Sequence, residues 1–249
     1  MNSTLNTAVS TQNQSPRYEI NHYPAELIDT RRVHTASGQH RLTLRPVLPQ
    51  DGRLLADLVA GLSPLSRRHR FHGAVRLSAQ RLAQMACVDF ERELAVVVTS
   101  HVNGAERVIA DARYHLNPNT GVAEFAVMVD EAWRRMGIGS WTLQALQSAA
   151  AAAGLQGLVG QVLLDNQPML GLMNACAFAL RPDPEDERVV QAPSQWSGLG
   201  SADSAPRHRP GMLGWLARQL MPRTGVCTRA PSSTTTPTPT TTPAPALSH

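Results

Sequence analysis

The chain has 249 residues, of which 42% are hydrophobic, 17% are charged and 4% are aromatic. This length and composition fit one globular domain with appendages, and no apolar run approaches the roughly 20 residues that would cross a bilayer. The formal charge is +4, and all 23 residues counted as lysine or arginine are arginine, because the sequence contains no lysine.

The first thirty residues are polar and lack the apolar segment of a secretory signal. The three cysteines are scattered and lack the spacing of metal ligands. We therefore expect a cytoplasmic protein with no metal site and no transmembrane segment.

Residues 1–38 are polar without periodicity, which predicts a flexible N-terminal arm. Alternating apolar residues from Leu42 to Val47 predict a strand, and a helix is expected to begin near Pro49. The segment 78–87 predicts a second helix. These elements open a domain that we expect to span residues 39–192.

Three runs of β-type residues follow, "LAVVVTS", "RVIADARYHL" and "VAEFAVMV". Turn residues separate them, at Asn103-Gly104 and again over residues 117–121. Runs joined by such short turns predict an antiparallel meander of three strands.

An alanine-rich helix is predicted to begin near Gly139 and to end at Gly154. A strand "LVGQVLL", a helix over residues 168–175 and a final hairpin of "AFALRP" with "RVVQA" complete the pattern. This order predicts an α/β fold, with a mixed, mostly antiparallel sheet flanked by helices.

Two appendages are predicted after the domain. Residues 193–228 form a basic linker with a short amphipathic segment, which either docks on the domain or contacts a membrane surface or partner. Residues 229–249 are rich in threonine and proline and are expected to be disordered.

The stretch "RRMGIGS", residues 134–140, joins the third meander strand to the alanine-rich helix. Backbone N–H groups at a helix start have no intrahelical partner, and the helix dipole adds partial positive charge there. Gly137 and Gly139 let an anion approach the backbone, and the two arginines add charge. The stretch therefore predicts a diphosphate site, the alternative being glycines that serve only a tight turn.

Two other phosphate motifs fit less well. A dinucleotide-binding fingerprint needs a third glycine where this chain has Thr142, and a P-loop needs a lysine that the sequence lacks.

"RRMGIG" resembles the Arg/Gln-x-x-Gly-x-Gly/Ala signature of GNAT N-acetyltransferases, whose fold embraces acetyl-CoA. The resemblance extends over about Leu42 to Gln191. "LSPLSRRHRFHGAVRLS", "VDFERELAVVV", "AEFAVMVDEAWRRMGIG" and "DNQPMLGLMNACAF" are similar, in this order, to GNAT domains of bacterial protein lysine acetyltransferases.

The resemblance implies acetyl-CoA as cosubstrate, with its pantetheine arm along the strand that precedes the loop. The implied cofactor-binding residues are Met128, Val129, Arg134, Arg135, Gly137, Ile138, Gly139, Ser140 and Asn166. For Asn166, capping of the following helix is an equally open role.

The chemistry needs a base, because a lysine amine with a pKa near ~10.4 is almost fully protonated at neutral pH. Glu124 is the candidate catalytic residue, as a carboxylate in an otherwise apolar strand beside the cofactor. An outward-facing, solvated Glu124 is the alternative. Met173 stands where many GNAT enzymes carry a tyrosine general acid, so we assign no general acid.

The acceptor is the least determined part. The basic "RRHRFH", residues 67–72, is either the rim of an acceptor cleft or a solvated helix face. We expect an acetyl-CoA-dependent N-acetyltransferase that acts on an amine, either protein lysine or a small molecule. A non-catalytic acyl-CoA-binding regulatory domain is the alternative, and no nucleic-acid partner is expected. The lack of lysine reflects either genome composition or an advantage to an enzyme that acetylates lysines.

Overall fold

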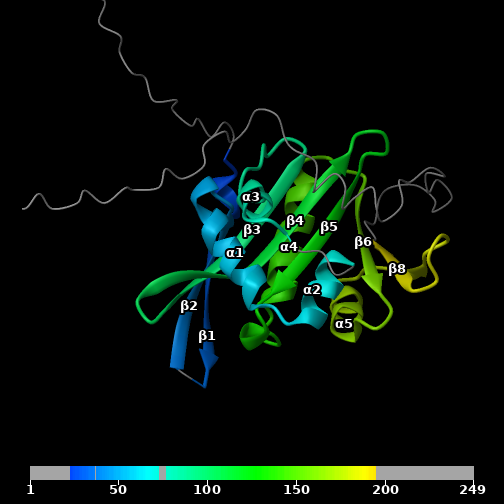
Figure 1. Cartoon of the computed structure of the whole chain (residues 1–249). Helices are drawn as coiled ribbons and strands as arrows, with labels where there is room; N and C mark the ends of the chain where they lie inside the picture. Colours follow the sequence, from blue (N-terminus) through cyan, green and yellow to red (C-terminus); the bar gives the residue numbers. More distant parts are fainter. Residues whose placement is uncertain (1–22, 37, 73–76, 195–249) are drawn as a thin grey trace, which may run out of the picture.

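A computed structural model describes residues 23–36, 38–72 and 77–194 (Figure 1). The helices are η1 (Ala25–Leu27), η2 (Pro49–Asp51), α1 (Gly52–Gly61), α2 (Pro64–Phe71), α3 (Ala79–Gln84), η3 (Glu131–Trp133), α4 (Ile138–Ala152) and α5 (Gln167–Ala175). The strands are β1 (Asp29–Thr35), β2 (Gly38–Pro46), β3 (Glu93–Val102), β4 (Ala105–Asn117), β5 (Val122–Val129), β6 (Gly157–Leu163), β7 (Arg181–Pro182) and β8 (Val189–Pro193).

The strands form one mixed sheet in the order β1-β2-β3-β4-β5-β6-β8-β7. From β1 to β5 every neighbouring pair is antiparallel, and the pairing of β3, β4 and β5 confirms the predicted meander. β5 and β6 are parallel and pair only at Val122↔Gly157, Ala123↔Leu158 and Glu124↔Val159. Beyond these positions the two strands diverge, and the gap between them is called the cleft below.

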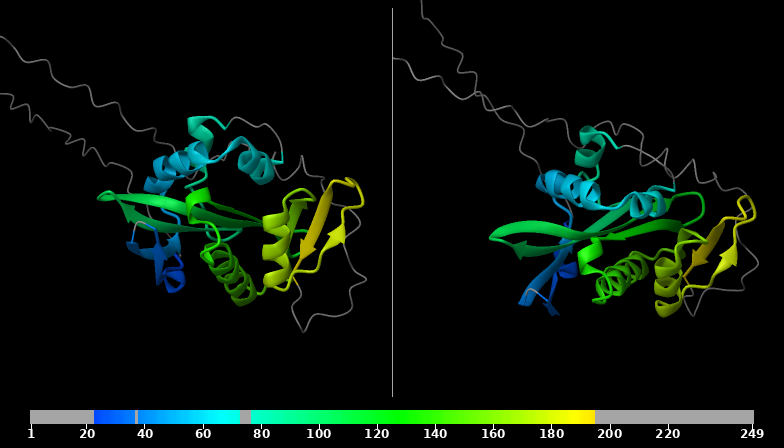
Figure 2. Two further views of the ribbon diagram at one scale, coloured as in Figure 1. Left: turned by 90° about the horizontal axis from the view of Figure 1, so that it is seen from below. Right: turned by 60° about the horizontal axis from the view of Figure 1, so that its bottom comes forward.

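Helices cover both faces of the sheet (Figure 2). α1, α2 and α3 lie on one face, and α4 and α5 lie on the other. The core on the α4 side contains fully buried Leu143 and Leu146 with strand residues such as Val96, while the core on the α1 side contains Leu55 and Val97. The alternation of side chains along a strand supplies both cores, so β3 is buried on both faces.

β1 differs from the sequence-based expectation, which placed residues 29–35 in a flexible N-terminal arm. The strand pairs with β2 over its whole length. Trp141 of α4 holds it by donating its indole N–H to Asp29 Oδ2 at 2.9 Å, and the Arg31 guanidinium lies 4.6 Å from the Trp141 ring centroid. These contacts join residues more than 100 positions apart, so the local sequence pattern does not reveal them.

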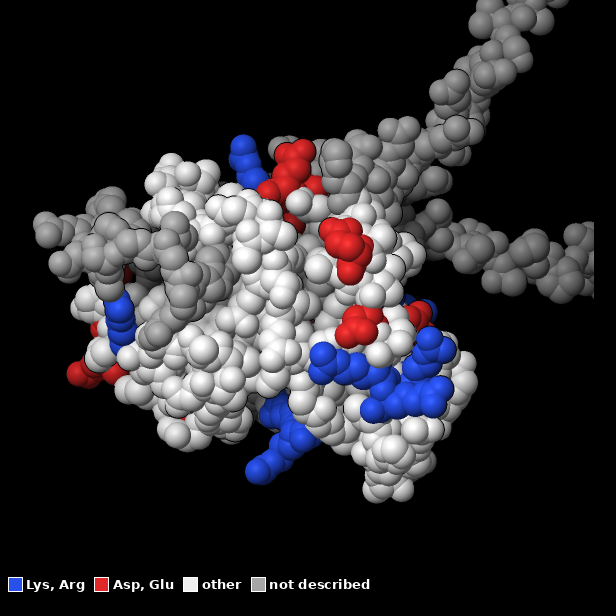
Figure 3. Space-filling model, turned by 180° about the vertical axis from the view of Figure 1, so that it is seen from behind, with Lys and Arg blue, Asp and Glu red and all other residues white. Residues whose placement is uncertain are grey.

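Arginines mark the outer edge of the sheet. Arg31, Arg32 and Arg41 are exposed on β1 and β2, and Arg32 stands directly opposite Arg41. Figure 3 shows basic side chains gathered over this hairpin, beside a broad uncharged region on the α4 side. Charged side chains on an edge strand discourage pairing with a strand of another molecule.

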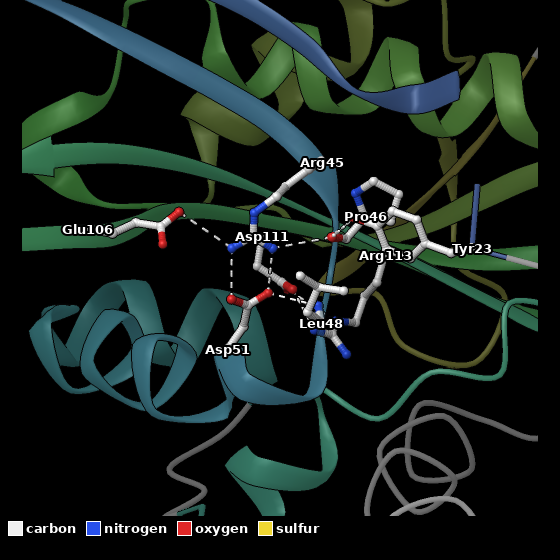
Figure 4. A network of polar contacts seen from close by, with 8 residues as sticks. All are labelled: Tyr23, Arg45, Pro46, Leu48, Asp51, Glu106, Asp111 and Arg113. Carbon is white, nitrogen blue, oxygen red and sulfur yellow. Dashed lines mark hydrogen bonds and ion pairs between the residues drawn. The ribbon is translucent and has the colours of Figure 1, made fainter. Parts of the chain in front are cut away.

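A buried polar network joins β2 to the start of α1 (Figure 4). Arg45 bonds both oxygens of Asp51, at 2.6 and 2.8 Å, and Asp51 also accepts from the Leu48 backbone N–H. The Asp51 side chain is almost fully buried, and bidentate pairing with a further backbone bond is what such burial requires. On β4, the buried pair of Asp111 and Arg113 lies nearby in the same view.

Gly160 of β6 is required by a close approach at the base of the cleft. A Cβ atom on Gly160 would lie 2.6 Å from Cζ of Phe125, whose ring packs 5.0 Å from that of Phe178. We expect Gly160→Ala to lower the free energy of unfolding by about 1–3 kcal/mol, because overpacking displaces a buried ring. Denaturant unfolding measures this change.

Gly171 of α5 provides the matched control, because its added Cβ would meet no atom within 4 Å. Gly171→Ala should raise the free energy of unfolding by up to about 1 kcal/mol through helix propensity. Equal effects of the two alanines would contradict the packing argument at Gly160.

The predicted linker and the Thr/Pro-rich tail lie almost wholly beyond residue 194 and so outside the described residues, as does the predicted arm before residue 23. Within the described ranges, no helix is both long and apolar enough to cross a membrane.

Candidate active site

A cavity of about 860 Å³ occupies the cleft. Its walls come from β5 and β6, and α2 covers one side. The loop after β5, the first turn of α4 and one side of α5 close the other. The volume lies within the range of small-molecule and cofactor sites. The divergence of two parallel strands therefore creates a cavity of a size that a cofactor could occupy.

The N-terminus of α4 faces this cavity. The first helical bond runs from Trp141 N to Gly137 O at 2.9 Å, so the N–H groups of Ile138, Gly139 and Ser140 have no partner within the helix. No side chain caps this end, and its first turn contains no acidic residue. The arrangement fits an anion such as a diphosphate, through free donors and the positive end of the helix dipole.

The two glycines of the loop have different physical reasons. Gly137 has φ +76°, the left-handed region that glycine adopts at little cost, and an added Cβ would meet no atom within 4 Å. Gly139 approaches α5 closely, because an added Cβ would lie 3.1 Å from Leu172 Cδ2. Arg135 also has a positive φ, of 64°. The loop is thus shaped by backbone conformation at one glycine and by helix packing at the other.

The side chain of Arg134 is held by the protein. Its Nε donates to Val129 O at 3.1 Å, and Nη2 donates to Ser66 Oγ at 2.9 Å. Glu131 Oε1 lies 3.8 Å from the same Nη2. Arg134 and Arg135 both line the cavity, so the predicted positive charge is present beside the helix start.

Backbone hydrogen bonds establish which residues of β5 face the cleft. Just before β5, Gly121 O accepts from Gln156 N on the β6 side at 2.9 Å. Just after β5, Asp130 N donates to Ile109 O of β4 at 2.8 Å. Because the backbone groups of successive strand residues point to opposite edges, the odd-numbered residues of β5 face β6 and the even-numbered ones face β4.

This parity separates the two β5 residues expected to bind pantetheine. Val129 turns its backbone groups to the cleft, where the strand has no β6 partner. Met128 pairs through its backbone with Asp111 of β4, and its side chain lies in the core on the α1 side and reaches the cavity wall. Val127, which the sequence-based prediction omitted, faces the cleft like Val129.

Glu124 lines the cavity from the last position at which β5 pairs with β6. Its side chain is on the α1 face of the sheet, opposite in phase to Phe125, whose ring packs in the core on the α4 side. The half-buried carboxylate is therefore an element of the cavity wall, and its strand partner on β4 is His115.

α2 is attached to the β5 side of the cleft through Glu131. Glu131 Oε1 accepts from Ser63 N at 3.0 Å and from Ser66 Oγ at 2.6 Å. These hydrogen bonds lower the pKa of Glu131 to about 2, with a smaller contribution from Arg134. The carboxylate is thus ionised throughout the physiological range.

α2 is also attached to the β6 side. Arg68 Nη1 donates to Asp165 Oδ2 at 2.6 Å, which lowers the pKa of Asp165, and His69 Nε2 lies 3.2 Å from Asp165 Oδ1. His72, at the end of the helix with φ 53°, hydrogen-bonds the backbone of Gln161 on β6. One short helix therefore contacts both walls of the cleft.

Burial lowers the pKa values of two residues on the inner side of α2. The pKa of His72 falls to about 4, first because of burial and then because of the nearby Arg70. Burial also lowers the pKa of Arg70 to about 10, although Asp111 opposes the shift. At neutral pH the imidazole of His72, on the side of the cavity that α2 covers, is therefore uncharged.

The shift at His72 predicts a pH dependence of stability. Because its folded-state pKa, about 4, lies below the ordinary histidine value of 6.5, the unfolded chain binds the proton more tightly, and stability is lost as pH falls from 6.5 towards 4. His72→Asn, which tolerates a left-handed φ, should remove about 2–3 kcal/mol of this loss between pH 7 and 4.5. Urea unfolding at both pH values measures this change in the free energy of unfolding. An equal loss of stability in wild type and His72→Asn would show that His72 is not its source.

α5 contributes apolar residues to the cavity. Asn166 caps the helix, with its side chain accepting from Met169 N at 3.3 Å, and it also lines the cavity, so both roles foreseen for it are compatible. Met173 is fully buried in the core on the α4 side rather than in the cavity wall. Among the described residues that line the cavity, no tyrosine is present.

Comparison with known proteins finds similar sequences and a similar fold. Residues 70–178 match the model of the acetyltransferase (GNAT) family. An acetyltransferase of Pseudomonas aeruginosa is 27% identical over 154 residues, which cover 61% of this chain and 82% of that protein.

Acetyltransferase Pat of Mycolicibacterium smegmatis is 32% identical over 132 residues, covering 53% of this chain but only 39% of Pat. This chain thus spans about two fifths of Pat. Among solved structures, the GNAT domain of S. lividans PAT has the same fold, with a TM-score of 0.58 and 23% identity over 69% of this chain and 98% of that domain.

Proposed function

We propose that this chain, which belongs to the GNAT acetyltransferase family and is an acetyl-CoA-dependent enzyme, acetylates lysine side chains of other proteins. The single observation that carries the proposal is the joining, in one cavity, of an uncapped helix start and a carboxylate. The first suits the phosphates of coenzyme A, and the second suits the deprotonation of an amine.

The residues present fit coenzyme A. The free N–H groups at the start of α4, with Arg134 and Arg135 beside them, would hold the diphosphate. The open edge of β5 at Val127 and Val129 would hydrogen-bond the pantetheine arm as a neighbouring strand would. When bound, the thioester supplies an activated acetyl group.

Glu124 is the proposed general base. It would take a proton from the acceptor ammonium, because only the neutral amine has the lone pair that attacks a carbonyl carbon. A backbone N–H at the cleft edge of β5 would stabilise the negative charge that develops on the carbonyl oxygen. Substrate binding at both ends of one cavity permits direct transfer without a covalent enzyme intermediate.

Protein lysine is the proposed acceptor. The motifs that resemble lysine acetyltransferases run through α2, β5 and α5, the elements that build the cavity. The complete absence of lysine from the chain also means that the enzyme presents no competing side-chain amine of its own. Leu65, 55% exposed, and Arg68 lie on α2 at the cavity rim and suit contact with a protein surface.

The test is incubation of the full chain with acetyl-CoA and a protein extract from cells that lack the gene. We expect new acetyl-lysine peptides by mass spectrometry, and every one must come from an acceptor because the enzyme has no lysine. Transfer only to a panel of small amines would instead identify a small-molecule acetyltransferase. Calorimetric binding of coenzyme A without any transfer would identify an acyl-CoA-binding regulatory domain.

A further inference from the structure

Three titratable residues stand in one row across the sheet. Glu93 of β3 pairs with His115 of β4, and His115 pairs in turn with Glu124 of β5. Directly opposite residues of antiparallel strands are on the same face, with Cβ atoms about 4.5–5.5 Å apart. The row therefore leads from the cavity wall at Glu124, through an imidazole, to a second carboxylate outside the cavity.

The outer pair of the row is hydrogen-bonded. Nδ1 of His115 lies 2.8 Å from Oε1 of Glu93, and the His115 side chain is 27% exposed while that of Glu93 is 12% exposed. An ionised carboxylate only accepts, so Nδ1 carries the proton and donates it. In the neutral ring this leaves the lone pair on Nε2, which makes that nitrogen a proton acceptor.

The proposed reaction must export a proton. The acceptor ammonium loses two protons on becoming an amide, the bond between carbonyl carbon and sulfur breaks, and the departing thiolate takes up one of them. One proton per turnover is left for the solvent. Glu124, which takes the first proton, must therefore give it up before the next amine can be deprotonated.

We propose that His115 is a positioning residue that accepts this proton from Glu124 and passes it to water, while Glu93 holds the ring. The inference rests on the proposed function. The proton moves from a Glu124 oxygen to Nε2 of His115, Nδ1–H stays on Glu93, and the imidazolium releases its Nε2 proton at its exposed edge. The carboxylate of Glu93 stabilises the transient positive charge, as a carboxylate does beside a catalytic histidine.

Other charges face this row. Arg113, two residues before His115 on the same face of β4, is paired with Asp111 and bonds Met85 O at 2.9 Å. Arg70 and His72 line the cavity from α2. Arg113 thus takes part in a buried ion pair, whereas His115 lies between Glu124 in the cavity wall and Glu93, with its side chain partly exposed to solvent.

The test compares His115→Gln with His101→Gln in the full chain. Glutamine can hydrogen-bond Glu93 but cannot carry the proton, so His115→Gln should lower kcat by about tenfold or more, with KM for acetyl-CoA and the Kd of coenzyme A unchanged. His101 is exposed at the other end of β3, and its substitution should leave kcat unchanged. Unchanged kcat in His115→Gln would overturn the proposal.

Chemical rescue separates proton transfer from a structural role. Added imidazole should restore kcat in His115→Ala in proportion to its concentration, and should restore nothing in the double variant His115→Ala/Glu124→Gln. Loss of activity in His115→Ala that imidazole does not restore would overturn the proposed proton transfer from Glu124 to His115, called the relay below. If wild-type protein transfers no acetyl group, the proposed function has failed, and if Glu124→Gln remains fully active, the base assignment has failed. Failure confined to the His115 variants concerns the relay alone.

Discussion

Replacement of Glu124 by glutamine should lower kcat for acetyl transfer by about 10²–10⁴-fold, the usual contribution of a general base. The amide matches the carboxylate in shape and remains in the cavity wall, but it cannot take a proton at neutral pH. Coenzyme A should bind as before, because its phosphates are proposed to bind at the start of α4 rather than at Glu124. Release of the coenzyme A thiol measures the rate, and calorimetry measures binding.

Glu187→Gln provides the matched control, since Glu187 is exposed in the turn before β8 and does not line the cavity. It should have wild-type kcat and KM. A Glu124→Gln protein with wild-type kcat would refute the base assignment, and a large loss of coenzyme A affinity would show that Glu124 supports binding instead.

Replacement of Gly137 by aspartate should weaken coenzyme A binding at least about a hundredfold. The new carboxylate would stand next to the free N–H groups of Ile138 and Gly139, where it repels the diphosphate and competes for the same donors. The protein itself should not lose stability, because the site is spacious, aspartate tolerates a positive φ, and a negative charge at a helix start is favourable. Calorimetric titration with coenzyme A and thermal unfolding measure the two effects.

Gly137→Asn separates charge from shape, because asparagine has the same size and also tolerates a positive φ. Its affinity for coenzyme A should lie much closer to that of the wild type. Equal losses of coenzyme A affinity in the two variants would mean that the size of the new side chain, and not its charge, weakens binding. That result would remove the electrostatic argument for the diphosphate site.

The features that depend on neighbouring residues were predictable from the sequence. The N–H groups at the start of α4 follow from the glycine pattern and the onset of a helix, both readable within residues 134–140. The meander follows from the turns between its strands. Glu124 stood out because a carboxylate interrupts an apolar strand, and the structure places it in the cavity wall.

Features that depend on the pairing of distant segments were not predictable in the same way. The sequence of β1 is polar, and only contacts such as Trp141 to Asp29 explain why it forms a strand. From the sequence, Met128 and Val129 are equally good candidates for backbone contact with pantetheine. Only the alternation of backbone hydrogen bonds along β5 shows that Val129 faces the cleft and Met128 faces β4. The row from Glu93 to Glu124 exists because two strand registers bring 93, 115 and 124 into line.

The attachment of α2 to both sides of the cleft has a mechanical consequence. Ser63 and Ser66 hold the helix to Glu131, and Arg68 holds it to Asp165. The eight-residue helix therefore connects the two walls and limits how far the cleft can open. A ligand too bulky for the cleft must break the contacts of α2 with Glu131 or with Asp165. Because Arg68 and Asp165 form an exposed ion pair, high salt should loosen the helix at that end, whereas the hydrogen bonds from Ser63 and Ser66 to Glu131 should depend less on salt.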